Sequence, residues 1–374
     1  MPLRTERNAP LLRLGFAGLV LMQVVFLSSC STQGADAPAP SMPGDSAPPS
    51  ATTGGGTPSS DSPFEKPREE SGPVSIQIVT NGISPFWDPM AIGMEKAAKE
   101  LDGCSAQWTG PQNSEVGEQK KMIEAAMAKG VDGIAISCIE AKASEAIINA
   151  VLEKGVPVIT FDSDSPDSKR LVYIGTNNFN AGKAAGDAAI KLLPSGGKFV
   201  GFVGNISAQN ARERRDGFVE AAKAGKIELL DVLDDNKGAE RARRNVEDTI
   251  AKRKDEIQGL LGLFSYNGPA IANAIESQPA MKGKYKIVAF DAEPVTLKKL
   301  EAGAIDATVV QKPYDFGYLS TKLLYLINRK GLSAALKELK VPESRIYDTG
   351  VEVITPATVK EYKKKLEEIG VKSS

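Results

Sequence analysis

The sequence predicts an α/β protein with two similar, doubly wound parallel-sheet lobes. Three observations support this prediction. From Val74 onward, apolar runs of strand length alternate with stretches of helical period, which is the pattern of βαβ units. The alternation forms two successive series, each long enough for a lobe of its own. Residues 156–161 form an unbroken run of apolar, β-branched and aromatic side chains, as in a strand covered on both faces.

The first series begins with a strand and a helix whose limits are well marked. Asp88 begins the helix with Pro89 at its first position. Proline is tolerated there because an N–H at this position would have no partner within the helix. The predicted buried face of this helix carries Met90, Met94, Ala97, Ala98 and Leu101. The predicted strands of the series are 74–79, 104–109, 131–137, 156–161 and 171–174, with further helices at 114–129 and 142–154.

The second series repeats the first and then adds a C-terminal extension. Its predicted strands are 198–203, 227–233, 259–264, 285–290 and 307–311, with helices between them. After Pro313, an amphipathic helix is expected to run to about Arg329, followed by a strand at 346–354. Thr355 is expected to cap a last, charged helix.

Composition limits the classes of function. The 374 residues include 46 basic and 47 acidic side chains, so the net charge of -1 gives no reason to expect a nucleic-acid partner. The chain contains no histidine. Catalytic sites built on Ser/His or Cys/His pairs, and imidazole metal sites, are therefore excluded. Three cysteines are too few for a disulfide framework.

The N-terminus has the features of an export signal. Arg4, Arg7 and Arg13 precede an apolar run, 14–27, that is too short to span a membrane. The run ends in Leu27-Ser28-Ser29-Cys30, which resembles the bacterial lipobox. That resemblance implies a signal peptide at 1–30, lipidation of Cys30 and a lipid anchor on a membrane facing the periplasm or cell surface. The alternative is a secreted protein with a chance cysteine at this position.

Residues 31–73 are rich in Pro, Gly and Ser, with Met42 and Phe64 as the only large apolar side chains. Such a segment cannot bury a core. We expect a disordered tether between the anchor and the folded body.

Polar and aromatic side chains follow the predicted strands where ligands of open α/β sheets bind, outside the carboxyl ends of the strands. In the first lobe these are Ser84, Phe86, Trp87, Ser137, Cys138, Asp162, Ser163 and Asp164. In the second lobe they are Arg212, Arg214, Tyr266, Asn267, Asp291, Glu293 and Gln311.

These residue types suit a polyol. Carboxylate, amide and guanidinium groups each offer two hydrogen-bonding atoms to adjacent hydroxyls, and exposed aromatic rings suit the C–H face of a sugar. Each residue also has a purely structural interpretation: Asp162, Asn267 and Asp291 as turn or helix caps, Phe86 and Trp87 as core aromatics, and Arg212 and Arg214 as a solvated helix face.

Several motifs then occur in a specific order across the folded body. They are Ser84-Pro-Phe-Trp, Val156-Pro-Val-Ile-Thr-Phe-Asp, Ala211-Arg-Glu-Arg with Gly217-Phe218, Val288-Ala-Phe-Asp291 and Val310-Gln311-Lys-Pro. On these motifs, the chain from Val74 to about Lys360 resembles the periplasmic sugar-binding proteins of the ribose-binding type, which are related in fold to the effector domains of LacI-type repressors.

The resemblance implies a set of ligand contacts, with departures. The implied positions are Ser84, Phe86, Trp87, Cys138, Asp162, Ser163, Arg212, Tyr266 or Asn267, Asp291 and Gln311. The ribose binders have Asn where Ser84 and Cys138 stand and Arg where Ser163 stands, so ribose itself is not implied. Asp164 is a candidate to compensate, and Glu293 is a further candidate beside Asp291.

The resemblance also implies a type I periplasmic-binding clamshell with a three-strand hinge. The expected lobes are 74–176 plus 312–343 and 177–311 plus 344–374. Such a protein captures a monosaccharide, a pentose or hexose, and delivers it to an ABC-type importer as a monomer, without cofactor or metal and without enzymatic activity. One alternative is a sensor of the same fold that docks on a membrane receptor. A repressor would need a helix-turn-helix before the first lobe, and a glycosidase would use a pair of cleft carboxylates.

Two other motifs fail on inspection. The segment 162–167 begins like a calcium loop, but Pro166 occupies a ligand position. Gly196-Gly197-Lys198 lacks the spaced glycine and the hydroxyl of a phosphate loop. Cys104 and Cys138 are expected at opposite edges of a parallel sheet, which argues against a disulfide between them.

Overall fold

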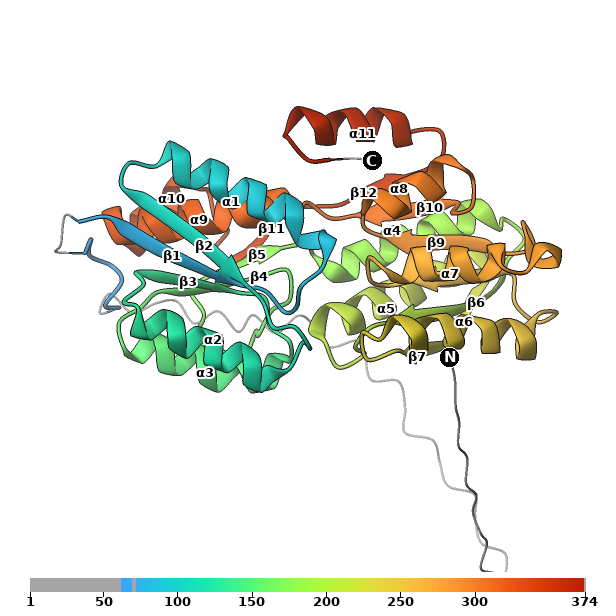
Figure 1. Ribbon diagram of the computed structural model, residues 1–374, viewed down its shortest axis with the longest axis horizontal. Coiled ribbons are helices and arrows are strands. Elements are labelled where there is room, and N and C mark those ends of the chain that lie inside the picture. The colour runs from blue at the N-terminus through green and yellow to red at the C-terminus, as the bar shows by residue number, and fades with distance from the viewer. Residues whose placement is uncertain (1–61, 69–71, 373–374) are drawn as a thin grey trace, which may run out of the picture. The chain divides into compact units, whose positions relative to one another are not determined.

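A computed structural model describes residues 62–68 and 72–372 (Figure 1). The chain divides into two units, 1–51 and 52–374, and the description below concerns the second. The expected signal peptide, the lipidation site Cys30 and most of the expected tether lie outside the described residues.

Two six-stranded sheets form the framework, and both have the same strand order. In the order of their pairing, the strands of the first sheet are β11 (Ile346–Asp348), β5 (Tyr173–Gly175), β4 (Val158–Phe161), β3 (Gly133–Ile136), β1 (Val74–Val79) and β2 (Cys104–Thr109). Those of the second are β12 (Glu352–Ile354), β10 (Ala307–Val310), β9 (Lys286–Phe290), β8 (Gly259–Gly262), β6 (Gly197–Val203) and β7 (Ile227–Asp234). All neighbours are parallel except β10 and β12. The prediction of two doubly wound parallel-sheet lobes is confirmed.

Helices cover both faces of each sheet, as parallel strands require. Those of the first lobe are α1 (Asp88–Glu100), α2 (Val116–Ala128), α3 (Ala141–Glu153), α9 (Pro313–Lys330) and α10 (Leu332–Glu338). Those of the second are α4 (Asn178–Leu192), α5 (Gln209–Ala222), α6 (Ala239–Arg253), α7 (Asn267–Glu276), α8 (Pro294–Glu301) and α11 (Val359–Glu368). Short 3₁₀ turns are η1 (Pro85–Trp87), η2 (Lys223–Gly225) and η3 (Pro279–Met281). In Figure 1, α1 and α9 lie on one face of the first sheet and α2 and α3 on the other.

The cores follow from the strand sequences. β3, β4, β8 and β10 are buried along their whole length, because helices cover both faces and their side chains are apolar except for Thr160 and Thr308. The edge strand β2 alternates between exposed and half-buried positions. The inner strands therefore hold each lobe together, and their carboxyl ends are fixed in place.

One helix pair in each lobe packs with its backbones almost touching. A Cβ added to Gly93 of α1 would collide with the backbone of α9, and one on Gly317 of α9 with that of α1. Gly182 of α4 and Gly217 of α5 stand in the same relation in the second lobe. Because only glycine permits this approach, the pairs hold α1 and α5, which directly follow the first strand of each sheet, in fixed positions.

The chain passes between the two sheets three times: from β5 to α4, from β10 to α9 and from β11 to β12. The last passage corrects the sequence analysis, which expected one strand over 346–354 and a lobe limit at 343. Gly350, with φ of 73°, breaks that strand into β11 and β12, so the chain crosses after Asp348.

Two further expectations were wrong. The last helix begins at Val359 with Thr358 before it, so Thr355 does not cap it; the Thr355 carbonyl instead accepts from the Val359 amide. Residues 62–68, expected in the disordered tether, pack on the first lobe. Phe64 is 8% exposed within its core, and its carbonyl accepts a hydrogen bond from the Leu332 amide at 2.7 Å.

Within residues 62–68 and 72–372, no helix is long and apolar enough to cross a membrane. Cys104 and Cys138 are both free thiols.

Candidate functional site

Two aspartates occupy matching places in the two lobes. Asp162 follows β4 and Asp291 follows β9, and both have left-handed backbone, with φ of 58° and 68°. The Asp162 amide donates to Ile174 O at 3.2 Å, and the Asp291 amide donates to Val309 O at 2.8 Å, so each turn is tied to the next strand. Left-handed backbone is costly for a residue with a Cβ and is found where a side chain must leave the line of a strand.

Both side chains face one polar pocket of about 350 Å³ between the lobes. Its lining includes Asn81, Ser84, Phe86, Trp87, Asp162, Asn210, Arg214, Lys237, Tyr266, Asp291 and Gln311. The strand-end rule therefore brings together residues from positions more than 200 apart in the sequence.

Asp162 is held by neutral donors of its own lobe. The Ser137 hydroxyl donates to Asp162 Oδ2 at 2.7 Å and the Asn81 amide to the same oxygen at 3.3 Å. Burial raises the pKa of Asp162 to about 6, against the lowering effects of the Ser137 hydrogen bond and the Arg214 charge. The carboxylate is ionised at neutral pH, and its Oδ1 accepts no hydrogen bond from the described residues.

Asp291 is supported from the hinge. Gln311, which directly follows β10, donates from Nε2 to Asp291 Oδ1 at 3.0 Å. Burial raises the pKa of Asp291, while the charge of Arg214 and the hydrogen bonds of Gln311 lower it. Its second oxygen accepts no side-chain hydrogen bond from the part of the chain that the structure describes.

Arg214 is the buried cation of the site, at 2% exposed. Its Nε donates to Asn178 Oδ1 at 3.0 Å and its Nη1 to Leu263 O at 2.8 Å. The guanidinium lies 4.6 Å from the centre of the Phe290 ring, a cation–π distance. These contacts fix its position and leave Nη2 available.

Three buried polar atoms in the lining have no hydrogen-bond partner among the described residues: Arg214 Nη2, Asn210 Oδ1 and Gln311 Oε1. Buried polar groups without partners cost free energy, so their concentration in one pocket indicates that a polar ligand satisfies them.

The aromatic wall comes from η1. Phe86 is half-buried and packs edge-to-face on Trp87 with ring centres 4.7 Å apart. Trp87 is 2% exposed and rests on Phe161, 5.7 Å away, at the end of β4. One ring faces the pocket while the other is also part of the core, so both sequence interpretations of this pair apply.

Tyr266 and Asn267 differ in role. Tyr266 lines the pocket, and its hydroxyl donates to Asp235 Oδ1 at 2.5 Å. Asn267 does not line the pocket; its Nδ2 donates to Asp235 Oδ2 at 2.9 Å, and its Oδ1 accepts from the Phe264 amide. The buried Asp235 carboxylate, its pKa raised by burial to about 6, thus holds both residues in place.

Besides Asn267, four candidates lie apart from both interlobe pockets described here: Cys138, Ser163, Asp164 and Arg212. Asp164 forms a two-pronged ion pair with Arg170, with its oxygens 2.5 and 2.7 Å from Nε and Nη2. Cys138 is 1% exposed, and burial raises the pKa of its thiol. Arg212 donates to Ser207 O and Gln209 Oε1 of its own helix start.

Helix geometry explains the Arg212 result. Two residues along an α-helix turn the side chain by about 200°, so Arg212 and Arg214 point in nearly opposite directions. Both arginines were noted in the sequence; the resemblance implied Arg212, whereas Arg214 is the one that lines the pocket. The helical phase favours Arg214 as the inward-facing residue, since Phe218, four residues after it, is apolar and buried.

Sequence reasoning did not select Lys237 or Asn210 as site residues. Lys237 stands in the loop after β7, and no apolar pattern marks it. Asn210 adjoins the Ala211-Arg-Glu-Arg motif, and its position in the first turn of α5 aims it at the pocket.

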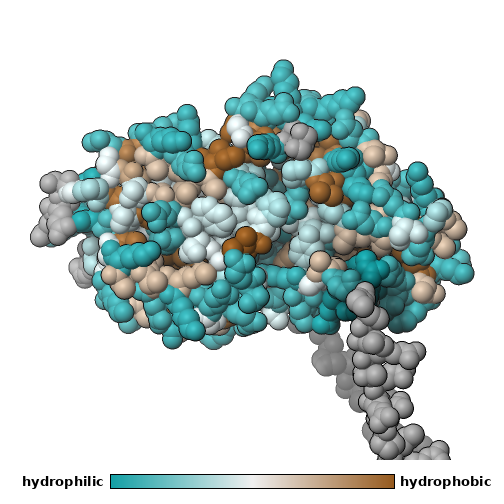
Figure 2. Space-filling model, viewed as in Figure 1, coloured by the Kyte–Doolittle hydropathy of each residue, from teal (hydrophilic) through white to brown (hydrophobic). Residues whose placement is uncertain are grey.

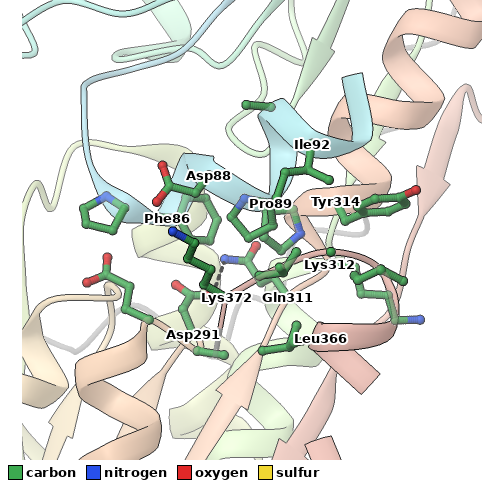
Figure 3. A pocket seen from close by; sticks show the side chains of 18 of the residues that line it. Phe86, Asp88, Pro89, Ile92, Asp291, Gln311, Lys312, Tyr314, Leu366 and Lys372 are labelled. Carbon is green, nitrogen blue, oxygen red and sulfur yellow. Dashed lines mark hydrogen bonds between the residues drawn. The ribbon is translucent and has the colours of Figure 1, made fainter. Parts of the chain in front are cut away.

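A second, larger pocket of about 770 Å³ adjoins the first on the side of α11. The two share Phe86, Asp291 and Gln311. Figure 3 shows the hydrogen-bonded Asp291–Gln311 pair among the lining side chains, with Lys372 beside it, Leu366 below, Ile92 above and Tyr314 to the right. Glu293 lines this pocket rather than the polar one, and its Oε1 accepts from the Ser265 hydroxyl at 2.7 Å. In Figure 2, hydrophobic residues border a hollow below α11.

Comparison with known proteins agrees with this geometry. Residues 76–331 match the family model described as periplasmic binding protein domain. The chain is similar to the xylose/arabinose-binding protein XylF of Sulfolobus acidocaldarius, 25% identical over 77% of this chain and 72% of that protein. It is also similar to the ribose import binding protein RbsB of Haemophilus influenzae, 30% identical over 63% of this chain and 79% of that protein.

Solved structures give the same result. An ABC transporter solute binding protein from Burkholderia graminis, in complex with D-arabinose, is 31% identical with a TM-score of 0.69, covering 79% of this chain and 99% of that one. GanP, a glucose-galactose binding protein from Geobacillus stearothermophilus, is 27% identical with a TM-score of 0.69, covering 76% and 98%. These relatives are binding proteins rather than enzymes. The chain belongs to the periplasmic binding protein domain family.

Proposed function

We propose that this protein captures a monosaccharide, a pentose or a hexose, between its lobes and delivers it to an ABC-type importer. The observation that carries the proposal is the pair of strand-end carboxylates, Asp162 and Asp291, facing one pocket of about 350 Å³. Ring hydroxyls donate to the open carboxylate oxygens and accept from Arg214 Nη2, while Phe86 covers a face of the ring. The names of the related proteins, which bind xylose, arabinose, ribose, glucose and galactose, support a sugar of this size.

A thermal-shift screen of the full chain tests the proposal. The panel contains D-ribose, D-arabinose, D-xylose, D-glucose, D-galactose and D-allose. At a ligand concentration of 100 times Kd, binding stabilises the folded state by about 2.7 kcal/mol. For lobes of this size that raises Tm by roughly 5 to 10 °C. A panel without any shift contradicts the proposal.

Ligand binding is expected to close the lobes about the three crossings while each lobe keeps its internal structure. X-ray scattering measures this as a smaller radius of gyration with the bound sugar. An unchanged radius for a sugar that binds contradicts the clamshell motion.

We also propose that the protein is exported and anchored by lipid on Cys30, at the end of a signal peptide at 1–30. The residues joining anchor and body act as a tether up to Ser62, where the packed segment begins, and the body acts as a monomer. Cys30→Ser should move the protein to the soluble or unprocessed fraction. Detergent-dependent membrane association that survives the substitution contradicts the anchor.

A sensory protein that docks on a membrane receptor would use the same pocket. Co-purification with a permease, in amounts that respond to the sugar, favours import.

A further inference from the structure

Lys237 stands on a tightly held loop of the second lobe. It lies between β7 and α6, and both Asn236 and Lys237 have left-handed backbone, with φ of 51° and 58°. The Lys237 amide donates to Gly204 O at 2.9 Å, and the Asn236 amide to Asp234 Oδ1 at 2.7 Å. Two successive strained residues, fixed by hydrogen bonds, are typical of a loop that aims a side chain.

The Lys237 side chain reaches across the cleft to the first lobe. Its stem passes Gly204, where an added Cβ would lie 3.2 Å from Lys237 Cγ. Its Nζ donates to Asn81 O at 3.1 Å, and Asn81 in turn donates to the Asp162 carboxylate. The ammonium is therefore two hydrogen bonds from the carboxylate that is proposed to bind the sugar.

This ammonium is incompletely satisfied. A lysine Nζ offers three donors, and the described residues accept one hydrogen bond from Lys237 and form no ion pair with it. Burial lowers the pKa of Lys237 to about 8, although the charge of Asp162 raises it. Two N–H groups remain for an acceptor within the polar pocket that Lys237 lines.

We propose that Lys237 is a specificity-determining residue, which donates to a sugar oxygen at the Asn81 end of the pocket while it ties the second lobe to the first. The inference rests on the proposed function. A sugar with a hydroxyl at that end satisfies the ammonium and adds a contact that spans both lobes. A monodeoxy analogue lacking that hydroxyl leaves the half-buried ammonium without that acceptor.

The charge on Lys237 gives a second readout. A ligand that binds the ammonium form loses affinity as the pH rises above about 8, by roughly tenfold at pH 9. The other groups facing the pocket whose pKa is shifted do not titrate there: the pKa values of Asp162 and Asp235 are about 6, and burial raises that of Tyr266 well above its usual 10. Burial also raises the pKa of the Asp291 carboxyl, and the Arg214 charge and the Gln311 hydrogen bonds oppose that rise.

The test is calorimetry on the full chain with whichever panel sugar binds most tightly, and with its monodeoxy analogues, at pH 7 and pH 9. Lys237→Met is expected to weaken binding by about tenfold to a hundredfold and to remove the penalty for one deoxy position. Lys237→Arg is expected to retain affinity and to abolish the loss at pH 9. The matched control is Lys226→Met, because Lys226 also has left-handed backbone, with φ of 57°, but is exposed and distant from the pocket.

Each outcome decides the matter. If the sugar binds Lys237→Met as it binds the wild type, and wild-type affinity is the same at pH 7 and pH 9, the inference is wrong and the proposed function stands. If Lys237→Met does not fold, the pH dependence of the wild type and of Lys237→Arg decides. A panel in which no sugar binds overturns the proposed function and this inference together.

Discussion

The two lobes offer the ligand the same backbone turn with different electrostatic support. The Ser137 amide donates to Val79 O and the Leu263 amide to Phe202 O, so these two residues hold equivalent places in the two sheets. In the first lobe the Ser137 hydroxyl supports Asp162 directly. In the second, the Leu263 carbonyl instead holds Arg214, whose charge lowers the pKa of Asp291.

This difference separates two contributions to the site. The repeated strand order places a carboxylate at the same point of each sheet. The hydrogen-bond donors then differ: Asp162 accepts from Ser137 and Asn81 of its own lobe, and Asp291 accepts from Gln311, while the charge of Arg214 lowers the pKa of both aspartates. Substitutions on the two sides should therefore differ in their effects, and the following predictions begin with the largest.

Arg214→Leu should weaken sugar binding by more than about a hundredfold and lower the free energy of unfolding by several kcal/mol, because Asn178 Oδ1 and Leu263 O lose their donor. Calorimetry and thermal melting measure the two effects. Arg212→Leu, two residues away on the same helix, is the matched control and should leave affinity within about twofold. Equal losses from both substitutions would contradict the helical-phase assignment.

Asp162→Ala and Asp291→Ala should each weaken binding by roughly tenfold to a hundredfold, the value of a charged hydrogen bond to the ligand. Asp162→Ala also leaves Ser137 and Asn81 without an acceptor, so it should cost more stability than affinity alone implies. Exposed Arg244→Ala is the control. Normal affinity in both folded aspartate variants would mean that the aspartates only shape turns.

The pH dependence of Asp162 gives the third prediction. Its folded-state pKa, about 6, lies above the ordinary value of 3.8. The stabilisation from its bound proton is therefore complete below about pH 4 and is lost as the pH rises through 6, by about 3 kcal/mol in the unliganded protein. Sugar affinity should run the opposite way and be about tenfold weaker at pH 5 than at pH 7, since the ligand donates to the ionised form.

Comparison with Asp162→Asn isolates this titration, since Asp235 and Asp291 shift in the same direction and remain in both proteins. The difference in stability between the two proteins should change between pH 4 and pH 7. A constant difference over that range would show that Asp162 does not titrate near 6.

The smallest expected effect concerns the backbone. Glycine adopts φ of 58° or 68° without steric cost, so Asp162→Gly and Asp291→Gly should be more stable than the corresponding alanine variants by about 1 kcal/mol. Chemical denaturation of the four unliganded variants measures the gap. Alanine variants as stable as the glycine variants would show that the turns relax.

Much of the fold and about half of the candidate pocket lining could be predicted from the sequence. Strand periodicity and the rule of carboxyl ends identified Asp162, Asp291 and Gln311, because a buried strand fixes where its last residue emerges. The predicted pocket residues that do not line the pocket are those whose side-chain direction depends on the local geometry of a turn or helix. Asp164 comes soon after β4, but the turn directs its side chain away from the pocket and into an ion pair with Arg170. That contact depends on the conformation of the loop, which the sequence pattern does not specify.

Lys237 and the packed segment at 62–68 were missed for a different reason. Neither belongs to a periodic element, and their positions depend on contacts with residues far away in the sequence. The segment that carries Phe64 packs closely against the loop at Gly331. A Cβ at position 331 would collide with Glu65 O, so this packing depends on a glycine there. No pattern within 31–73 contains that information.

The three crossings also govern the order of events when the chain is made. The first lobe needs α9 and β11, which follow α1 by more than 200 residues, as the hydrogen bond between Tyr318 and Glu100 shows. At 5 to 20 residues per second, roughly 10 to 40 s separate the synthesis of α1 from that of its partner helix. The first lobe to be translated is therefore unable to complete its core until the chain is almost finished. The interleaved topology thus leaves the first lobe without its full core while most of the chain is being made.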